Sequence, residues 1–325
     1  KSLGNIVSPQ DVVNVNGADI LRLWVVGSDY SEDLRIGPEI IKSHTDVYRR
    51  LRNTLRFLLG NLNGFEESER LPIAQMPELE RWALHRLWEM DQMIRKSCDD
   101  FHFHPLFTEI HNFCAIDLSA FYFDIRKDSL YCDRASSTTR RAARTVLDEV
   151  FNCLTAWLAP FICFTAEEAW LARHPDEAPS NSVHLRTFPD IPDAWRDDTL
   201  AAKWDKVRTL RRVVTGAIEL ERREKRIGSS LQAHPVVTAS AEDIAVFDGL
   251  DAAELFITSN ADFSTEPAGD GGFSMEEVPG ITVLPNQAQG EKCERCWKVL
   301  PDVGNDSEHP NVCGRCADAV NNSAS

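Results

Sequence analysis

The sequence lacks long apolar runs and a secretion signal. No window of about eighteen residues is apolar without interruption, which excludes an ordinary membrane-spanning helix. The first residues, Lys1-Ser2-Leu3-Gly4-Asn5, contain no basic start followed by an apolar stretch. We therefore expect a soluble, cytoplasmic protein without a membrane partner. The chain also begins without Met, so we expect it to be part of a longer polypeptide.

Cations are outnumbered by acids, and one stretch of the chain has no cations. The 325 residues hold 35 Lys+Arg against 51 Asp+Glu, a net charge of −16. Such acidity argues against a nucleic-acid partner, because phosphate contacts need Lys and Arg. However, the range from Ala239 to Glu291 holds eleven acids and no Lys or Arg, whereas the range from Lys203 to Arg226 holds nine cations. The acidity is therefore segregated, and a basic surface remains available for RNA.

The N-terminal part of the chain carries clear helix signals. Ser8-Pro9 predicts the start of a short helix that stops at Gly17. The mostly apolar range from Ala18 to Val26 predicts a second helix. A long helix is predicted from Gly37-Pro38 to Gly60, because apolar residues recur there at three- and four-residue steps.

Helical patterning continues from Pro77 to about residue 173, and antiparallel packing of such helices makes a bundle. A linker rich in Pro, Asp and Ser follows between His174 and Asp198. The range from Trp204 to Arg226 then predicts one more helix, with most of the nine cations on it.

Short β-like runs follow the basic helix. They are Pro235–Thr238, Leu255–Thr258 and Ile281–Leu284. A short helix is predicted between Glu242 and Leu250, and Gly269 to Gly272 form a Gly-rich loop. This mixture predicts a small α+β domain after the bundle.

The nine cysteines divide into two groups. Five are scattered through helix-patterned sequence and are interpreted as small core residues: Cys98, Cys114, Cys132, Cys153 and Cys163. The other four form a C-x2-C pair, sixteen intervening residues and a second C-x2-C pair: Cys293, Cys296, Cys313 and Cys316. Without a secretion signal, this spacing indicates a metal site rather than disulfides.

Zinc is the metal that the quartet predicts. Each C-x2-C places two thiolates on a tight turn, and two such turns supply the tetrahedral four-sulfur shell that zinc prefers. Four protein ligands leave no position for water, so we expect one structural zinc ion in a C-terminal ribbon. An iron–sulfur cluster and four unligated thiols are the disfavoured alternatives.

Trp297 stands next to the first pair, with Arg295, Lys298 and Arg315 nearby. A Trp beside cations on a small zinc scaffold can stack on an unpaired base. The alternative interpretation is that Trp297 covers the small core of the ribbon, and the sequence does not choose between the two.

Six segments, in order along the chain, resemble the C-terminal portion of bacterial-type isoleucyl-tRNA synthetases, which are class I aminoacyl-tRNA synthetases. The first resembles the tail of the K-M-S-K-S signature, and the last resembles the terminal zinc ribbon of that family. The segments are Lys1–Asn5, Gly17–Trp24, Phe121–Asp128, Phe164–Trp170, Lys225–Leu231, and Lys292–Trp297 with Cys313–Cys316. The resemblance covers essentially the whole chain.

The resemblance implies a mainly α fold with four parts. Residues 1–40 would end the catalytic domain, and residues 41–200 would form the anticodon-binding helix bundle. Residues 201–286 would form the α+β junction domain, and residues 287–325 the zinc ribbon. The family activates isoleucine with ATP and transfers it to tRNA(Ile), and a monomer is expected.

The resemblance also implies roles for individual residues. Lys1 matches the second lysine of the signature and would contact ATP. Trp297, Arg211 and Arg212 would contact tRNA, by base stacking and by phosphate contacts. No H-I-G-H-like element and no editing domain are found in the sequence, so this segment alone is expected to bind tRNA without catalysing the reaction.

Two alternatives stay open. One is a fragment of a valyl or leucyl synthetase, which the terminal ribbon disfavours. The other is a stand-alone, zinc-containing nucleic-acid-binding protein with no ligase role.

Overall fold

A computed structural model describes residues 7–175, 181–267 and 271–322. The chain divides into two units, of which the first comprises Lys1–Phe123 and Arg141–Arg196. The second comprises Asp124–Arg140 and Asp197–Ser325. Within the described ranges, no helix has the length and apolar character needed to cross a membrane.

The first unit begins with the three predicted helices, of which the third runs one residue beyond the predicted end at Gly60. Helix α1 spans Pro9–Asn16, α2 spans Ala18–Val26 and α3 spans Pro38–Asn61. Gly17 separates α1 from α2 with φ of +91°, in the region of backbone conformation that favours glycine. Pro38 opens α3 at a position where its missing N–H costs no hydrogen bond.

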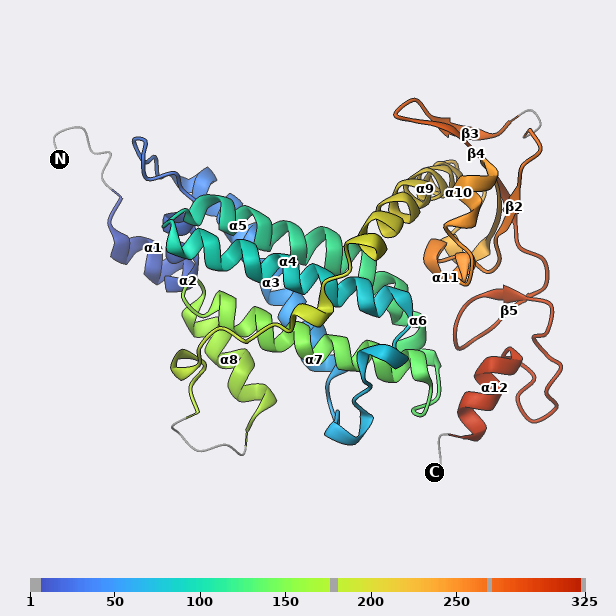
Figure 1. Ribbon diagram of the computed structural model, residues 1–325, viewed down its shortest axis with the longest axis horizontal. Helices are drawn as coiled ribbons and strands as arrows, with labels where there is room; N and C mark the ends of the chain where they lie inside the picture. Colours follow the sequence, from blue (N-terminus) through green and yellow to red (C-terminus); the bar gives the residue numbers. More distant parts are fainter. Residues whose placement is uncertain (1–6, 176–180, 268–270, 323–325) are drawn as a thin grey trace. The chain divides into compact units, whose positions relative to one another are not determined.

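The rest of the first unit is the predicted helix bundle (Figure 1). It contains α4 (Glu78–Asp99), α5 (Phe103–Asn112), the π-helix η3 (Phe113–Phe123), most of α7 (Thr138–Leu158) and α8 (Cys163–Arg173). Four short 3-10 turns flank them: Glu67–Glu69, Ile73–Gln75, Val183–Leu185 and Asp193–Trp195. Large apolar side chains fill the interior, among them Leu55, Leu84, Phe113, Phe151 and Trp157.

The second unit is built on helix α9 (Asp198–Arg223) and a four-stranded sheet (Figure 1). The sheet order is β2-β1-β4-β3, with β1 (Ala233–Thr238) and β4 (Val278–Gln287) antiparallel at its centre. Strand β2 (Asp262–Ser264) runs parallel to β1, and β3 (Phe273–Met275) runs antiparallel to β4. Helix α9 packs on β4 and β3. The small α+β domain is therefore confirmed.

One predicted strand is wrong. Leu255 and Phe256 lie in a short helix, α11 (Ala252–Phe256), because the Asp251 side chain accepts a hydrogen bond from Glu254 N and starts a helical turn there. Ile257 ends that helix with φ of +57°. The apolar run alone does not distinguish a buried strand from a buried helical turn.

The other predictions for this region are met in part. The strands at Pro235–Thr238 and Ile281–Leu284 are confirmed inside β1 and β4. Helix α10 (Ala241–Ala245) covers only the first four residues of the predicted helix between Glu242 and Leu250. Of the predicted Gly-rich loop, residues 269 and 270 lie outside the described residues.

The second unit also contains α6 (Asp124–Cys132) and the C-terminal ribbon. The ribbon consists of strands β5 (Glu291–Lys292) and β6 (Val299–Leu300), which pair antiparallel, and of helix α12 (Gly314–Asn321). A 3-10 turn, η6 (Ser230–Gln232), precedes β1.

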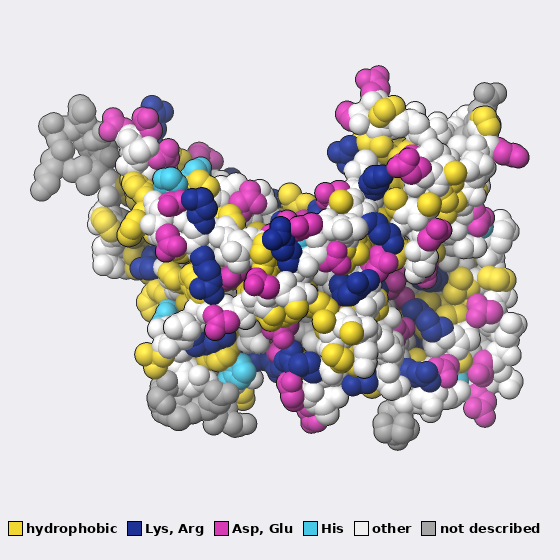
Figure 2. Space-filling model, viewed as in Figure 1, with side chains coloured by type: hydrophobic (Ala, Val, Ile, Leu, Met, Phe, Trp, Pro, Cys, Tyr) yellow, Lys and Arg dark blue, Asp and Glu magenta, His cyan; other side chains and the backbone are white. Residues whose placement is uncertain are grey.

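Charged side chains of both signs are mixed on the visible surface. In Figure 2, Lys and Arg side chains alternate with Asp and Glu side chains over the helices of the first unit. The net charge of −16 therefore does not make every surface acidic.

Candidate metal centre and nucleic-acid interface

Two tight turns of the ribbon present the cysteine quartet. Cys293 and Cys296 follow strand β5, and Cys293 N donates to Lys298 O at 2.9 Å to close the first turn. Cys313 is the residue that precedes helix α12, and Cys316 lies in the first turn of that helix. Local hydrogen bonding thus places each pair.

Gly290 lets the two strands of the ribbon meet. Its φ is +118°, and an added Cβ would lie 2.3 Å from the carbonyl atoms of Leu300 on β6. No side chain fits there, so the strand that leads into the first pair requires glycine.

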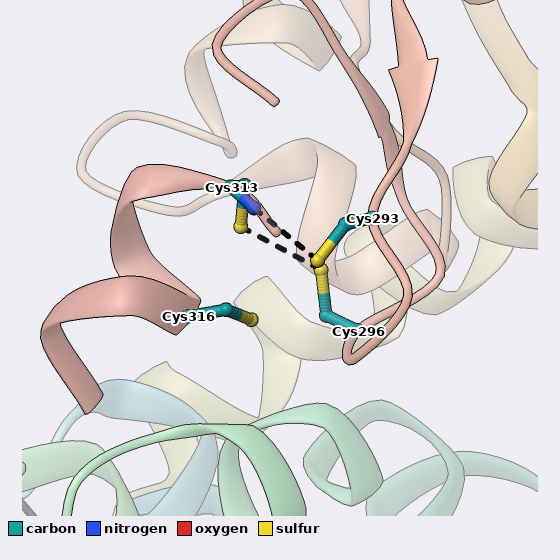
Figure 3. Close-up of side chains that lie close together, drawn as sticks. All are labelled: Cys293, Cys296, Cys313 and Cys316. Carbon is teal, nitrogen blue, oxygen red and sulfur yellow. Dashed lines mark hydrogen bonds between the residues drawn. The ribbon is translucent and has the colours of Figure 1, made fainter. Parts of the chain in front are cut away.

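The geometry of the quartet fits zinc. All four side chains are buried, and their sulfur atoms lie within 4.8 Å of one another. Cys296 Sγ and Cys313 Sγ are 3.8 Å apart, and sulfur atoms around a tetrahedral zinc also lie about 3.8 Å apart for Zn–S bonds of ~2.3 Å. Figure 3 shows the four side chains converging from the two turns. The four sulfur atoms complete the shell and leave no position for a reactive water.

The thiols need a cation to ionise together. A hydrogen bond with Cys132 raises the pKa of Cys316 to about 12, and a hydrogen bond with Cys316 raises the pKa of Cys296 further still. Burial raises the pKa of the Cys313 thiol as well. Burial also works to raise the pKa of Cys293, but backbone hydrogen bonds outweigh it and lower that pKa to about 6. Four thiolates in this space therefore require a bound metal.

A fifth cysteine joins the quartet. Cys132, at the end of α6, is buried in one cluster with the four ribbon cysteines. Its Sγ lies 3.7 Å from Arg295 O. The sequence interpretation of Cys132 as a small core residue is therefore correct but incomplete, since Cys132 packs against the cysteine quartet. No sequence signal marks it, because 163 residues separate it from Arg295.

The two arginines of the cysteine turns contact α6. Arg295 donates to Tyr131 O at 3.1 Å and also to Cys132 O. Arg315 forms ion pairs with Asp128 at 2.5 Å and with Asp133 at 3.2 Å. These guanidinium groups already bind carbonyl and carboxylate oxygens of the protein. They are therefore less available for RNA phosphates than the sequence of the ribbon alone suggests.

A mostly apolar cavity of about 380 Å³ lies between α6, α11 and the first cysteine turn. Its wall includes Ile125 and Tyr131 from α6, Ile257 after α11, and Trp297 with Lys298 from the ribbon. Tyr131 is 58% exposed and Trp297 is 62% exposed. Two aromatic side chains therefore border the opening of an apolar space.

Trp297 does not fill the core of the ribbon. Besides its exposure, the residue has φ of +66°, which is unusual for a large side chain. Lys292 Nζ lies 5.6 Å from the centre of its ring, within cation–π distance. The exposure argues against the interpretation that Trp297 covers the core of the ribbon, and base stacking stays a prediction.

The two predicted phosphate contacts on α9 differ in environment. Arg211 Nε donates to Leu255 O at 2.6 Å, and burial lowers the pKa of this guanidinium. Arg212, its neighbour, is exposed. Arg211 therefore ties α9 to the end of α11, whereas Arg212 faces solvent. Lys1, the predicted ATP contact, lies outside the described residues.

Three family models match the chain in order. The model described as tRNA synthetases class I (I, L, M and V) matches residues 1–37. The model for the anticodon-binding domain of tRNA ligase matches residues 80–237, and the zinc finger found in FPG and IleRS matches residues 290–319. The third match covers the cysteine quartet.

Curated relatives match the chain along nearly its whole length. The isoleucine-tRNA ligase of Caulobacter vibrioides is 52% identical over 323 residues, which cover 98% of this chain and 33% of that relative. The enzymes of Ruegeria pomeroyi and Agrobacterium fabrum are 52% and 50% identical, with the same two coverages. The chain thus spans about a third of the length of these relatives.

A solved structure is similar more distantly. It is the ternary complex of Agrobacterium radiobacter K84 agnB2 LeuRS with tRNA and LeuAMS, at 18% identity and a TM-score of 0.46, covering 61% of this chain and 22% of that one. The curated relatives, by contrast, are isoleucine-tRNA ligases, so the isoleucyl assignment is favoured over the valyl or leucyl alternative. The identity along 98% of the chain and the ordered family matches lead to one conclusion: the chain belongs to the isoleucine-tRNA ligase family.

Proposed function

We propose that this chain is the tRNA-binding part of an isoleucine-tRNA ligase that activates isoleucine with ATP and aminoacylates tRNA(Ile). The observation that carries the proposal is a metal-type cysteine quartet whose first turn presents an exposed Trp297 beside an apolar cavity. An exposed aromatic ring and a nearby apolar space suit an unstacked base. The identity to isoleucine-tRNA ligases supports the choice of RNA and amino acid.

The proposed cofactor is one structural zinc ion held by Cys293, Cys296, Cys313 and Cys316. When bound, the metal supplies a cross-link between the two turns and lowers the pKa of all four thiols. The chain's own residues do the rest: the turn closed by Cys293 N and Lys298 O holds the backbone that positions Trp297.

RNA binding is proposed to combine stacking with phosphate contacts. Trp297 and Tyr131 would stack on bases, while Lys127 and Lys298, which also line the cavity, would neutralise nearby phosphates. On α9, Arg212 is the exposed candidate for a phosphate contact, and Arg211 is retained as a weaker candidate because its guanidinium already binds a carbonyl oxygen.

Several expectations from sequence remain part of the proposal. Lys1 would contact ATP in the whole enzyme. Residues 1–40 would end the catalytic domain, residues 41–200 would form the anticodon-binding bundle, residues 201–286 the junction domain and residues 287–325 the ribbon. The protein would act as a cytoplasmic monomer.

Titration of the 325-residue chain with a tRNA(Ile) transcript tests the proposal. We expect Trp297→Ala to raise the Kd about 5- to 150-fold, the equivalent of losing one stacked base. Trp297→Phe is the matched control, because it keeps an aromatic face at the same backbone position and should retain most of the affinity. Equal affinities for the chain, both variants and an unrelated tRNA would overturn the stacking role.

A further inference from the structure

Helix α6 ends on residues that do not suit a helix C-terminus. The last four carbonyl groups of an α-helix lack intrahelical partners, and cations near them are favourable. The last turn of α6 has no basic residue, Asp128 immediately precedes that turn, and Asp133 follows the helix. Locally, Asp133 N donates to Ser129 O at 3.2 Å, and the carbonyl groups of Tyr131 and Cys132 lie beyond that bond.

The ribbon supplies what α6 lacks. Arg295 donates to two carbonyl groups of the last turn, Tyr131 O and Cys132 O. Arg315 binds Asp128 with both Nη atoms, at 2.5 and 2.8 Å, and also binds Asp133 at 3.2 Å. Arg295 therefore caps carbonyl groups at the end of α6. Arg315 neutralises the two carboxylates near that end.

Both arginines occupy the same place in their cysteine turns. Arg295 stands immediately before Cys296 and Arg315 immediately before Cys316, so each turn has the pattern C-x-R-C. A metal that fixes the four sulfur atoms therefore also fixes the backbone from which each guanidinium extends. Cys132 adds a direct contact, because its buried thiol packs in the same sulfur cluster.

We propose that metal binding by the quartet orders the C-terminal turn of α6, through Arg295, Arg315 and Cys132. Metal loss frees the two turns, and the arginines no longer hold the helix end. The 380 Å³ cavity is also lined by Asp128, Tyr131 and Cys132. The order of this wall of the cavity therefore depends on the metal, although the metal does not line the cavity itself. The inference rests on the proposed zinc site and not on RNA binding.

Hydrogen exchange of the full chain tests the coupling. The zinc-loaded protein and the chelator-treated, reduced protein are compared in peptides covering 124–133, 290–319 and, as a reference, α4 (78–99). We expect removal of zinc to speed amide exchange at 290–319 and at 124–133 alike, and to leave α4 unchanged. Unchanged protection at 124–133 in a chain that has lost its zinc overturns this inference while the zinc site stands.

Variants test the arginines while all four cysteine ligands are retained. Arg295 Nη1 also lies 3.7 Å from Cys316 Sγ, so the zinc content is measured in every variant. Arg295→Ala combined with Arg315→Ala should keep one zinc per chain and yet speed exchange in the last turn of α6 roughly tenfold or more, because charged hydrogen bonds are lost there. Arg222→Ala is the matched control, since Arg222 forms an exposed pair with Glu219 at 2.8 Å on α9, away from α6 and the ribbon, and should change neither quantity. Exchange equal to the parent in the double variant overturns the inference, and a chain that binds no zinc overturns both proposals.

Discussion

The carboxylate of Asp19 accepts hydrogen bonds from both the amide and the hydroxyl of Thr165, at 2.9 and 2.7 Å. It also accepts from Phe164 N at 3.2 Å, so a residue of α2 caps the N-terminus of α8. One turn later on α2, Arg22 donates to the carbonyl groups of Pro160 and Phe161, which follow the end of α7. At the corner between α7 and α8, the acid of α2 therefore binds the N-terminus of α8, and the cation of α2 binds carbonyl groups that follow the C-terminus of α7. Each charge has the sign that the helix dipole favours.

Loss of the Asp19 carboxylate should destabilise the helical unit. Asp19 is buried, and Asp19→Ala removes a cap and three hydrogen bonds to a charged acceptor, for an expected loss of about 1–3 kcal/mol. The measurement is the urea midpoint of the zinc-loaded chain, followed by far-ultraviolet circular dichroism. Asp11→Ala, which removes an exposed acid from α1, is the control and should leave the midpoint within error. A midpoint shift as small as that of the control would contradict the capping role.

Replacement of one quartet cysteine should abolish stoichiometric zinc. Cys313→Ser removes a thiolate from a closed four-sulfur shell and should reduce the zinc content well below one per chain after dialysis against a weak chelator. Metal analysis of the purified chain gives the result. Cys98→Ser, a change at a cysteine outside the cluster, should retain the full zinc content. Retention of zinc by both variants would place the metal elsewhere.

Zinc binding should release about three protons per chain near pH 7. The metal-free pKa of Cys293 is lowered to about 6, so that thiol is already ionised, whereas the pKa values of the other three ligands are raised and those thiols carry protons. Protons therefore compete with the metal, and affinity should fall as pH is lowered, more steeply below about pH 6, where Cys293 is protonated too. Calorimetry in buffers of different ionisation enthalpy counts the protons. A release near zero would contradict the protonated state expected for Cys296, Cys313 and Cys316 in the metal-free chain.

Neutralising each of the two neighbouring arginines of α9 should affect a different property: tRNA binding for Arg212 and thermal stability for Arg211. Arg212→Gln is expected to weaken binding of tRNA and to reduce the slope of log K against log salt by about one, because an exposed phosphate contact is lost. Arg211→Gln should instead lower the thermal stability, since its guanidinium donates to Leu255 O, and should leave the salt slope nearly unchanged. Salt-dependent titrations and melting curves of both variants check this. Identical salt slopes for Arg212→Gln and the parent would remove Arg212 from the RNA surface.

Local patterns were sufficient for most of the helices. The limits of α1, α2 and α3 follow from Ser8-Pro9, Gly17 and Gly37-Pro38, because caps, prolines and glycines act on the nearest few residues. The cysteine quartet was equally predictable, since a C-x2-C turn is a local structure and the two turns lie sixteen residues apart. The strand predicted at Leu255–Thr258 was wrong, because a run of a few apolar residues is too short to show either the period of a strand or that of a helix.

The sequence by itself therefore determined most of the helices, the family and the ligand chemistry of the candidate metal centre, because each rests on short segments whose residues lie close together in the chain. Only the tertiary structure decided which side chains surround that centre. Arg295 and Cys132 are 163 residues apart, and Asp128 and Arg315 are 187 apart. The local pattern around each residue is compatible with a solvated arginine, a small core cysteine or a surface aspartate. The partners are selected by packing of α6 against the ribbon, which no local period or spacing encodes.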